Sequence, residues 1–110
     1  MATPEGRIKA KLDKMLSRLG VWFYSPQAGP YGVSGIPDRV ICAAGKFIGI
    51  EAKADATKKP TALQRQCMAK IEAAGGKCFV VYDDETIQKA EQYITEVLGV
   101  SNRTSKGSGS

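Results

Sequence analysis

The stretch that decides the fold is residues 35–53, with the sequence GIPDRVICAAGKFIGIEAK. Two largely apolar runs flank Ala44-Gly45, and glycine suits a tight turn, so the pattern predicts a β-hairpin. If these two residues form the turn, Asp38 lies directly opposite Glu51. Directly opposed residues have Cβ atoms roughly 4.5–5.5 Å apart, where like charges repel. A divalent cation held between these two carboxylates would offset that repulsion.

The two-residue alternation of a strand places a third charged residue on the same face. Lys53 follows Glu51 by two positions, so both side chains leave the strand in the same direction. A cation site beside a fixed ammonium suits hydrolysis of phosphate esters. The alternative is a three-residue turn at 43–45, which would pair Asp38 with Ile50 and leave a solvated hairpin face of ordinary surface charges.

The composition is that of one small globular domain. The chain has 110 residues, of which 43% are hydrophobic and 25% charged. No apolar run approaches the roughly 20 residues that span a bilayer, and lysines and arginines interrupt the N-terminus where a signal peptide would be apolar. We therefore expect a cytoplasmic protein without a membrane partner. Residues 1–100 are expected to form the domain, whereas the Ser- and Gly-rich residues 101–110 are typical of a flexible tail or of residues added to the natural chain.

Histidine is absent and three cysteines are widely spaced. This excludes catalytic triads built on histidine and disfavours a zinc site. The bland interpretation of Cys42, Cys67 and Cys78 is as small buried hydrophobic residues. Catalysis, if present, would use carboxylates, lysine and a hard metal ion.

The positive charge is concentrated in the first part of the chain. The net charge is +5, but residues 1–77 contain 13 Lys and Arg against 6 Asp and Glu, while residues 78–110 contain 3 against 5. The basic excess therefore accompanies the candidate site, which suits a polyanionic partner such as DNA.

Hydrophobic periodicity predicts the remaining elements. A helix is expected from Thr3-Pro4 to Gly20, followed by an aromatic strand at 21–24 and a Gly- and Pro-rich loop at 26–37. After the hairpin, Pro60-Thr61 opens a second helix, which ends at Gly75-Gly76. Its buried face is expected to consist of Leu63, Cys67 and Ile71.

The last two elements complete an α/β domain. Residues 78–82 form a nearly continuous apolar run, which predicts a strand buried on both faces. Asp83-Asp84 then caps a helix whose inward side chains are expected to be Ile87, Ala90, Ile94, Val97 and Leu98. The resulting order, α-β-β-β-α-β-α, predicts a small mixed central sheet flanked by helices.

Several of these segments together resemble a known family. They are Gly32-x-x-Gly35-x-Pro37-Asp38-Arg39, Ile50-Glu51-x-Lys53, Thr61-x-x-Gln64 and Ala74-Gly75-Gly76. In this spacing and element order the chain resembles the PD-(D/E)XK nuclease superfamily over residues 5–82. Within it, the chain is most similar to the small stand-alone VRR-NUC proteins of phages and bacteria, which implies a restriction-endonuclease-like fold and a bacterial or phage-infected host cell.

The resemblance implies a metal centre. Asp38, Glu51 and the backbone carbonyl of Ala52 would bind one or two Mg²⁺ or Mn²⁺ ions. Glu5 matches an acidic residue of the family's first helix that can add a carboxylate, although it also suits the start of a helix in its own right. Mg²⁺ prefers oxygen ligands and retains several waters, so this set would suffice.

The resemblance also implies roles around the metal. Lys53 would orient and polarise the attacking water, and Gln64 would support the site from the second helix, with a solvated first-turn residue as the alternative. Tyr24 and Tyr31 could stack or hydrogen-bond near the substrate, but for Tyr24 the sequence favours packing in the core. The candidate DNA-contacting residues, each of which a solvated surface also explains, are Lys9, Lys11, Lys14, Tyr31, Ser34, Lys58, Lys59 and Arg65.

The function that these features favour is that of a metal-dependent, structure-selective DNA endonuclease. Stand-alone relatives resemble Holliday-junction resolvases, so a homodimer acting on branched DNA is expected, with the last helix or the aromatic strand 22–24 at the interface. The alternatives are a flap, single-strand or nicking nuclease, or a catalytically silent DNA-binding module.

Overall fold

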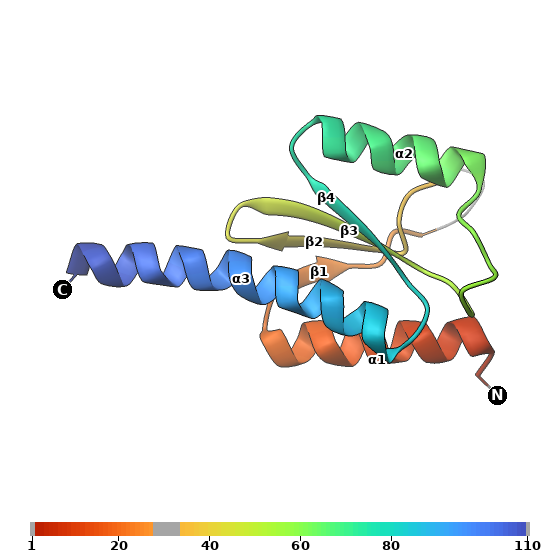
Figure 1. Ribbon diagram of the computed structural model, residues 1–110, viewed down its shortest axis with the longest axis horizontal. Helices are drawn as coiled ribbons and strands as arrows, with labels where there is room; N and C mark the ends of the chain where they lie inside the picture. Colours follow the sequence, from red (N-terminus) through yellow and green to blue (C-terminus); the bar gives the residue numbers. More distant parts are fainter. Residues whose placement is uncertain (1, 28–33, 110) are drawn as a thin grey trace.

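The computed structural model describes residues 2–27 and 34–109, with side chains described through Gly99. The order of elements is α-β-β-β-α-β-α, which confirms the expected order (Figure 1). Their bounds are α1 Pro4–Leu19, β1 Trp22–Tyr24, β2 Arg39–Ala43, β3 Lys46–Ala52, α2 Ala62–Ala73, β4 Lys77–Val81 and α3 Asp84–Gly109.

The four strands form one mixed sheet in the order β1-β2-β3-β4. The first three strands are antiparallel to their neighbours, and β4 runs parallel to β3. Arg39 pairs with Ile50, and the same register continues to the turn at Ala44-Gly45. The predicted register is therefore confirmed. One residue before β2, Asp38 stands opposite Glu51, and the three-residue turn is excluded.

The hydrophobic core lies on one side of this sheet, under α1 and α3 (Figure 1). The alternation of β3 sends Ile48, Ile50 and Ala52 into this core. The α1 and α3 side chains that meet them there are Ile8, Leu12, Met15, Leu16, Ile87, Ala90 and Ile94. Val97 and Leu98 pack partly buried against the same cluster, so the inward face predicted for the last helix is confirmed.

The other side of the sheet carries α2, which covers it only in part. α2 contacts β3 and β4, and none of its residues is buried. The prediction that Leu63, Cys67 and Ile71 form a buried face is wrong, because the Leu63 side chain is 55% exposed and the other two are half-buried. At the start of α2, the backbone of Leu63 lies close to Gly35, which belongs to the loop before β2. The Leu63 side chain remains in solvent.

Two further burial predictions are corrected. β4 is an edge strand, paired only with β3, so Cys78, Phe79 and Val80 are half-buried rather than buried on both faces. The cysteines are not uniformly buried either. Cys42 is exposed because α2 does not extend over β2, while burial raises the pKa of the half-buried Cys78 thiol to about 11.

The helix ends follow the sequence signals. The Thr3 hydroxyl accepts from the Gly6 N–H at 3.0 Å, and Gly20 ends α1 in the left-handed conformation. Asp83 caps α3 by accepting from the Thr86 N–H at 2.8 Å. α3 then continues through Gly109 and projects from the domain (Figure 1), so residues 101–109 have a helical backbone where the composition predicts a flexible tail. Among the described residues, no helix has the length and apolar character to cross a membrane.

Candidate active site

The carboxylate pair is tied together by the backbone of both strands. The Asp38 N–H donates to Glu51 Oε1 at 3.2 Å, and the Ala52 N–H donates to Asp38 Oδ2 at 2.9 Å. Buried Pro37 fixes the approach to β2 by packing on Gly49, where an added Cβ would lie 2.8 Å from the proline Cγ. Both carboxylates therefore have defined positions on the α2 side of the sheet.

Glu51 is the buried charge of the site. It is 3% exposed, and its burial together with the charge of Asp38 raises its pKa to about 7. The ammonium of Lys53, 3.3 Å from Glu51 Oε2, opposes this shift without cancelling it. Burial is the larger cause of this shift, and the charge of Asp38 adds to it, as the opposed carboxylates in the sequence predict.

Gln64 connects α2 to the two charged side chains. Its Nε2 donates to Glu51 Oε2 at 2.6 Å, and its Oε1 accepts from Lys53 Nζ at 3.1 Å. The same Oε1 accepts from the Thr61 N–H at 2.8 Å, which makes Gln64 part of the capping box of α2. Gln64, which the resemblance implies to support the site from the second helix, thus contacts both Glu51 and Lys53.

The position of α2 depends on a close approach at Gly35. This residue has φ +87°, and an added Cβ would lie 2.7 Å from the Leu63 carbonyl carbon and oxygen. Only glycine combines that conformation with that distance. Gly35 therefore sets how closely the Gln64 end of α2 can approach the carboxylates.

We expect Gly35→Ala to destabilise the fold by about 1–3 kcal/mol and to weaken the Gln64 contacts, because α2 must move outward. Gly45→Ala is the matched control, since Gly45 has φ +80° but nothing within 4 Å of an added Cβ. Thermal unfolding of both variants measures the difference. Equal losses in the two variants would show that backbone conformation alone, rather than the contact with α2, matters at Gly35.

The structure adds a lysine that the sequence suggests only as a DNA contact. Lys9 Nζ lies 3.2 Å from Glu5 Oε2 and 3.6 Å from Asp38 Oδ1. Partial burial opposes its charge, but the two carboxylates outweigh that effect and raise the pKa of Lys9. The Lys9 ammonium therefore links the carboxylates of Glu5 and Asp38. Among the described residues, no group of three or more Cys, Asp or Glu side chains is placed to hold a metal ion.

An ion pair behind the site escaped the sequence interpretation. Arg39 Nε and Nη2 donate to the two oxygens of Asp13 at 2.6 and 3.0 Å, and Nη1 donates to the Asp38 carbonyl at 2.8 Å. The guanidinium thus joins the middle of α1 to the backbone of a site carboxylate. The signal that could have revealed it is an arginine directly after Asp38, on the face of the sheet that α1 covers.

The remaining candidate DNA contacts differ in their partners and in their exposure. Lys11 is engaged with Asp84 at 2.9 Å, and Arg65 donates to the Pro60 carbonyl at 2.6 Å. Tyr31 lies outside the described residues. The other four candidates are exposed, and they are Lys14, Ser34, Lys58 and Lys59.

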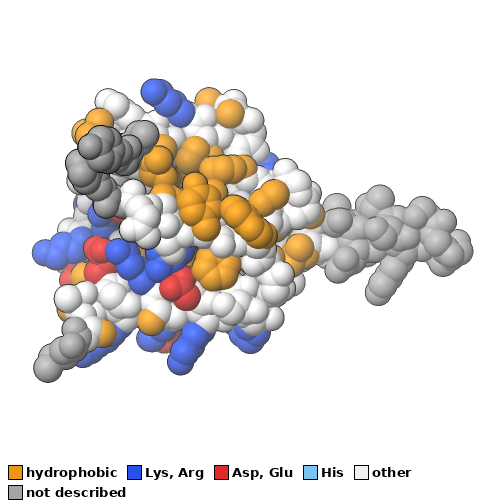
Figure 2. All heavy atoms as spheres, turned by 180° about the vertical axis from the view of Figure 1, so that it is seen from behind, with side chains coloured by type: hydrophobic (Ala, Val, Ile, Leu, Met, Phe, Trp, Pro, Cys, Tyr) orange, Lys and Arg blue, Asp and Glu red, His pale blue; other side chains and the backbone are white. Residues whose placement is uncertain are grey.

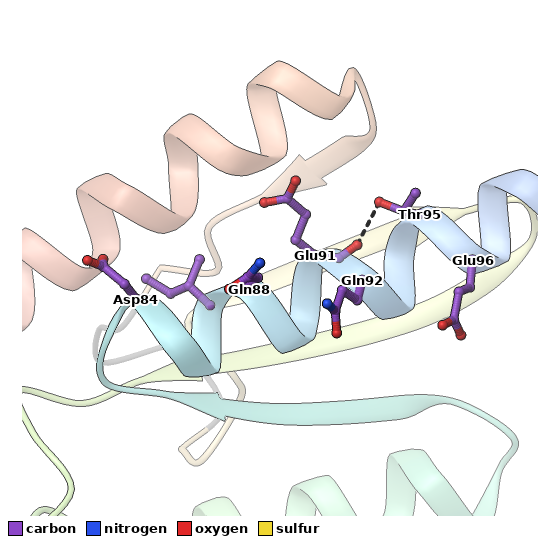
Figure 3. Close-up of a pocket in the computed structure, with 7 residues that line it drawn as sticks. Asp84, Gln88, Glu91, Gln92, Thr95 and Glu96 are labelled. Atoms are coloured by element: carbon purple, nitrogen blue, oxygen red, sulfur yellow. Dashed lines mark hydrogen bonds between the residues drawn. The ribbon is translucent and has the colours of Figure 1, made fainter.

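Several acidic side chains lie along α3. Figure 3 shows Asp84, Glu91 and Glu96 along this helix, together with amide side chains and Thr95, whose hydroxyl donates to the Glu91 carbonyl at 2.8 Å. These residues line a shallow groove. Lys11 and Arg18 of α1 pair with Asp84 and Glu91 there, so this groove carries charges of both signs.

Together, the fold and the site define a class of protein. A mixed sheet carries two opposed carboxylates and a lysine at the ends of adjacent strands, and a glutamine reaches them from the following helix, which is the arrangement of a restriction-endonuclease-like, nuclease-type domain.

The comparison with solved structures places the chain within that class. A structure described as a VRR_NUC domain superposes with a TM-score of 0.70 at 27% sequence identity, covering 80% of this chain and 94% of the other. Over most of its length the chain is therefore similar to a VRR_NUC domain. No family model matches the sequence, and no curated protein does so.

Proposed function

We propose that this protein is a Mg²⁺- or Mn²⁺-dependent endodeoxyribonuclease. The observation that carries the proposal is the pairing of Asp38 with Glu51 across adjacent strands, with Lys53 held 3.3 Å from Glu51. A domain that only bound DNA would gain nothing from two carboxylates directed at a polyanion. The geometry therefore favours a hydrolase over a silent DNA-binding module.

The residues present fit a divalent ion. Asp38 and Glu51 offer hard oxygen ligands, the type that Mg²⁺ and Mn²⁺ prefer. Burial and the charge of Asp38 raise the pKa of Glu51, and a bound cation would favour the ionised form of this carboxylate. Asp38 and Glu51, with the Ala52 carbonyl, would hold the ion, and Glu5 is an additional candidate. When bound, the ion supplies charge neutralisation on the phosphate and a more acidic water.

The chain's own side chains would prepare the phosphodiester for hydrolysis. The Lys53 ammonium lies beside the carboxylate pair, so it can orient a water and stabilise negative charge on the phosphate oxygens. Gln64 holds that ammonium at 3.1 Å while also holding Glu51. Arg39 keeps the Asp38 backbone fixed from behind. The two carboxylates and the lysine are thus positioned before substrate arrives.

A cleavage assay tests this function directly. Labelled four-way junctions, flaps, linear duplexes and single strands are incubated with the protein in EDTA and then with excess Mg²⁺, Mn²⁺ or Ca²⁺. We expect no cleavage in EDTA, cleavage with Mg²⁺ or Mn²⁺, and little with Ca²⁺, because its looser coordination suits catalysis poorly. Cleavage that persists unchanged in chelator would overturn the proposal.

We further propose that the protein acts in the cytoplasm as a homodimer on branched DNA. Two-fold symmetry would present two sites to the two strands that a junction offers for cleavage, and two-fold dimers are the commonest oligomers. Light scattering at micromolar concentration should give twice the chain mass, and junctions should be cut faster than linear duplex. A monomer that cuts both equally would favour the alternative of a flap, single-strand or nicking nuclease.

A further inference from the structure

Two exposed aromatic rings lie on the same side of the sheet as the carboxylate pair. Trp22 is 60% exposed and Tyr24 49%, with ring centroids 5.5 Å apart and an interplanar angle of 53°. They belong to the edge strand β1, two residues apart, so both side chains leave the strand on one face. Tyr24 is thus not part of the core. We call Trp22 and Tyr24 the aromatic face.

The strand register joins the aromatic face to the candidate active site. Tyr24 pairs with Val40. Val40 follows Asp38 by two residues, so both side chains lie on the same side of the sheet. Two residues of strand correspond to a displacement of roughly 7 Å. α2 covers the β3–β4 half of this side and leaves the half with β1 open.

The space-filling view shows the same combination of surfaces. In Figure 2, hydrophobic side chains gather in the middle of one side of the molecule, next to a group of basic and acidic side chains. Exposed aromatic rings near basic side chains are the pattern by which proteins hold single-stranded nucleic acid: cations contact the backbone while bases stack on rings. Lys53 and Lys9 lie at the carboxylate end, where each pairs with a site carboxylate.

We propose that the aromatic face is a stacking site for unpaired nucleotides next to the bond to be cleaved. This inference rests on the proposed function and narrows its substrate class. Within a duplex, each base is covered by its neighbours in the stack, so its flat surface cannot lie on a tryptophan or tyrosine ring. The aromatic face therefore selects DNA whose strand is open beside the scissile phosphate, such as a flap or an opened branch point.

The competing occupant is a second copy of this chain. β1 contains only three residues. Such a short edge strand offers few backbone hydrogen bonds for pairing between two copies. The two rings tilt by 53° relative to one another, so their faces are not coplanar. Unpaired bases can stack on an exposed ring face without a long strand edge, and the experiment below distinguishes the two occupants.

Intrinsic fluorescence provides a specific measurement, because Trp22 is the only tryptophan in the chain. Metal-free protein in EDTA is titrated with a short oligothymidylate, with a blunt duplex of equal charge as comparison. We expect saturable quenching by the single strand and none by the duplex. The measurement requires no cleavage, so it succeeds or fails independently of the nuclease activity.

Variants separate stacking from general electrostatic attraction. By anisotropy of a labelled oligonucleotide, Trp22→Ala and Tyr24→Ala should each weaken single-strand binding about 5- to 150-fold. Trp22→Phe, which keeps a ring, should retain most of the affinity. Leu63→Ala is the matched control, since this exposed apolar side chain lies on α2, outside the aromatic face, and it should bind like the wild type.

Two outcomes would overturn the inference. If Trp22→Ala and wild type bind single strands equally, the aromatic face does not stack bases. If Trp22→Ala instead converts a dimer to a monomer by light scattering while single-strand binding is unchanged, the aromatic face is an interface between copies.

Discussion

Asp38→Asn and Glu51→Gln should each reduce DNA cleavage by at least about 100-fold in saturating Mg²⁺. Loss of a residue that merely supports a metal ligand typically costs 10–100-fold, and these two side chains are the ligands of the proposed site. Asp38→Asn retains an oxygen that can accept from the Ala52 N–H, so the local fold should persist. Initial cleavage rates on a branched substrate, with circular dichroism to verify folding, measure the effect.

The matched control is Glu96→Gln, which removes an exposed carboxylate from α3. It changes the net charge by the same amount as either site variant, so it corrects for the stronger attraction of a more positive protein to DNA. Control and wild type should cut at the same rate. Full activity in Asp38→Asn would show that the carboxylate pair is structural.

In metal-free buffer, the stability of the domain should fall as the pH rises from about 5 to 8. The pKa of Glu51 is about 7 in the folded chain against an ordinary value of 4.5. The folded state therefore binds this proton more tightly than the unfolded state, so the free energy of unfolding decreases as pH passes from 4.5 to 7 and then levels off. The shift corresponds to a loss of roughly 3 kcal/mol.

Denaturant unfolding in EDTA at several pH values measures this dependence. Glu51→Gln should have a flatter profile, because the titrating group is gone, whereas Glu96→Gln should follow the wild type. Adding Mn²⁺ at pH 8 should restore stability to the wild type, since a bound cation stabilises the ionised pair. A wild-type profile that is as flat as that of Glu51→Gln would contradict the burial and charge repulsion assigned to Glu51.

The sequence predicts the hairpin well because several local signals agree. Ala44-Gly45 fixes the turn, and alternation along β3 separates core residues such as Ile50 from site residues such as Glu51. Once the register is known, the position of Asp38 follows without tertiary information. The cap at Thr3 and the helix start at Pro60-Thr61 rest on equally local signals.

Burial on the α2 side could not be predicted in the same way. Whether Leu63 is buried depends on how far α2 extends over the sheet, and that is decided by the backbone approach at Gly35. The half-burial of Phe79 follows from the place of β4 at the sheet edge, which an apolar run of five residues does not reveal. Both errors arise from arrangement between elements rather than from local propensity.

The residues of the candidate site likewise fall into two groups, those that local sequence signals bring together and those that packing between elements brings together. Asp38, Glu51 and Lys53 lie on one hairpin and its exit, so their spacing brings them together. Lys9 and Asp13 come from α1, so their contacts with Asp38 and Arg39 depend on how α1 packs against the sheet. Gln64 lies between the two cases, because its helix position follows from the capping box while its contact with Glu51 requires the packing of α2.

Titration of the metal-free protein with Mn²⁺, followed by the loss of the free-ion electron paramagnetic resonance signal, tests the central claim most directly. The account predicts saturable binding by the wild type and by Glu96→Gln, and its loss in Asp38→Asn and Glu51→Gln. Absence of saturable binding by the wild type, or equal binding by Asp38→Asn, would contradict the assignment of this carboxylate pair as the metal site.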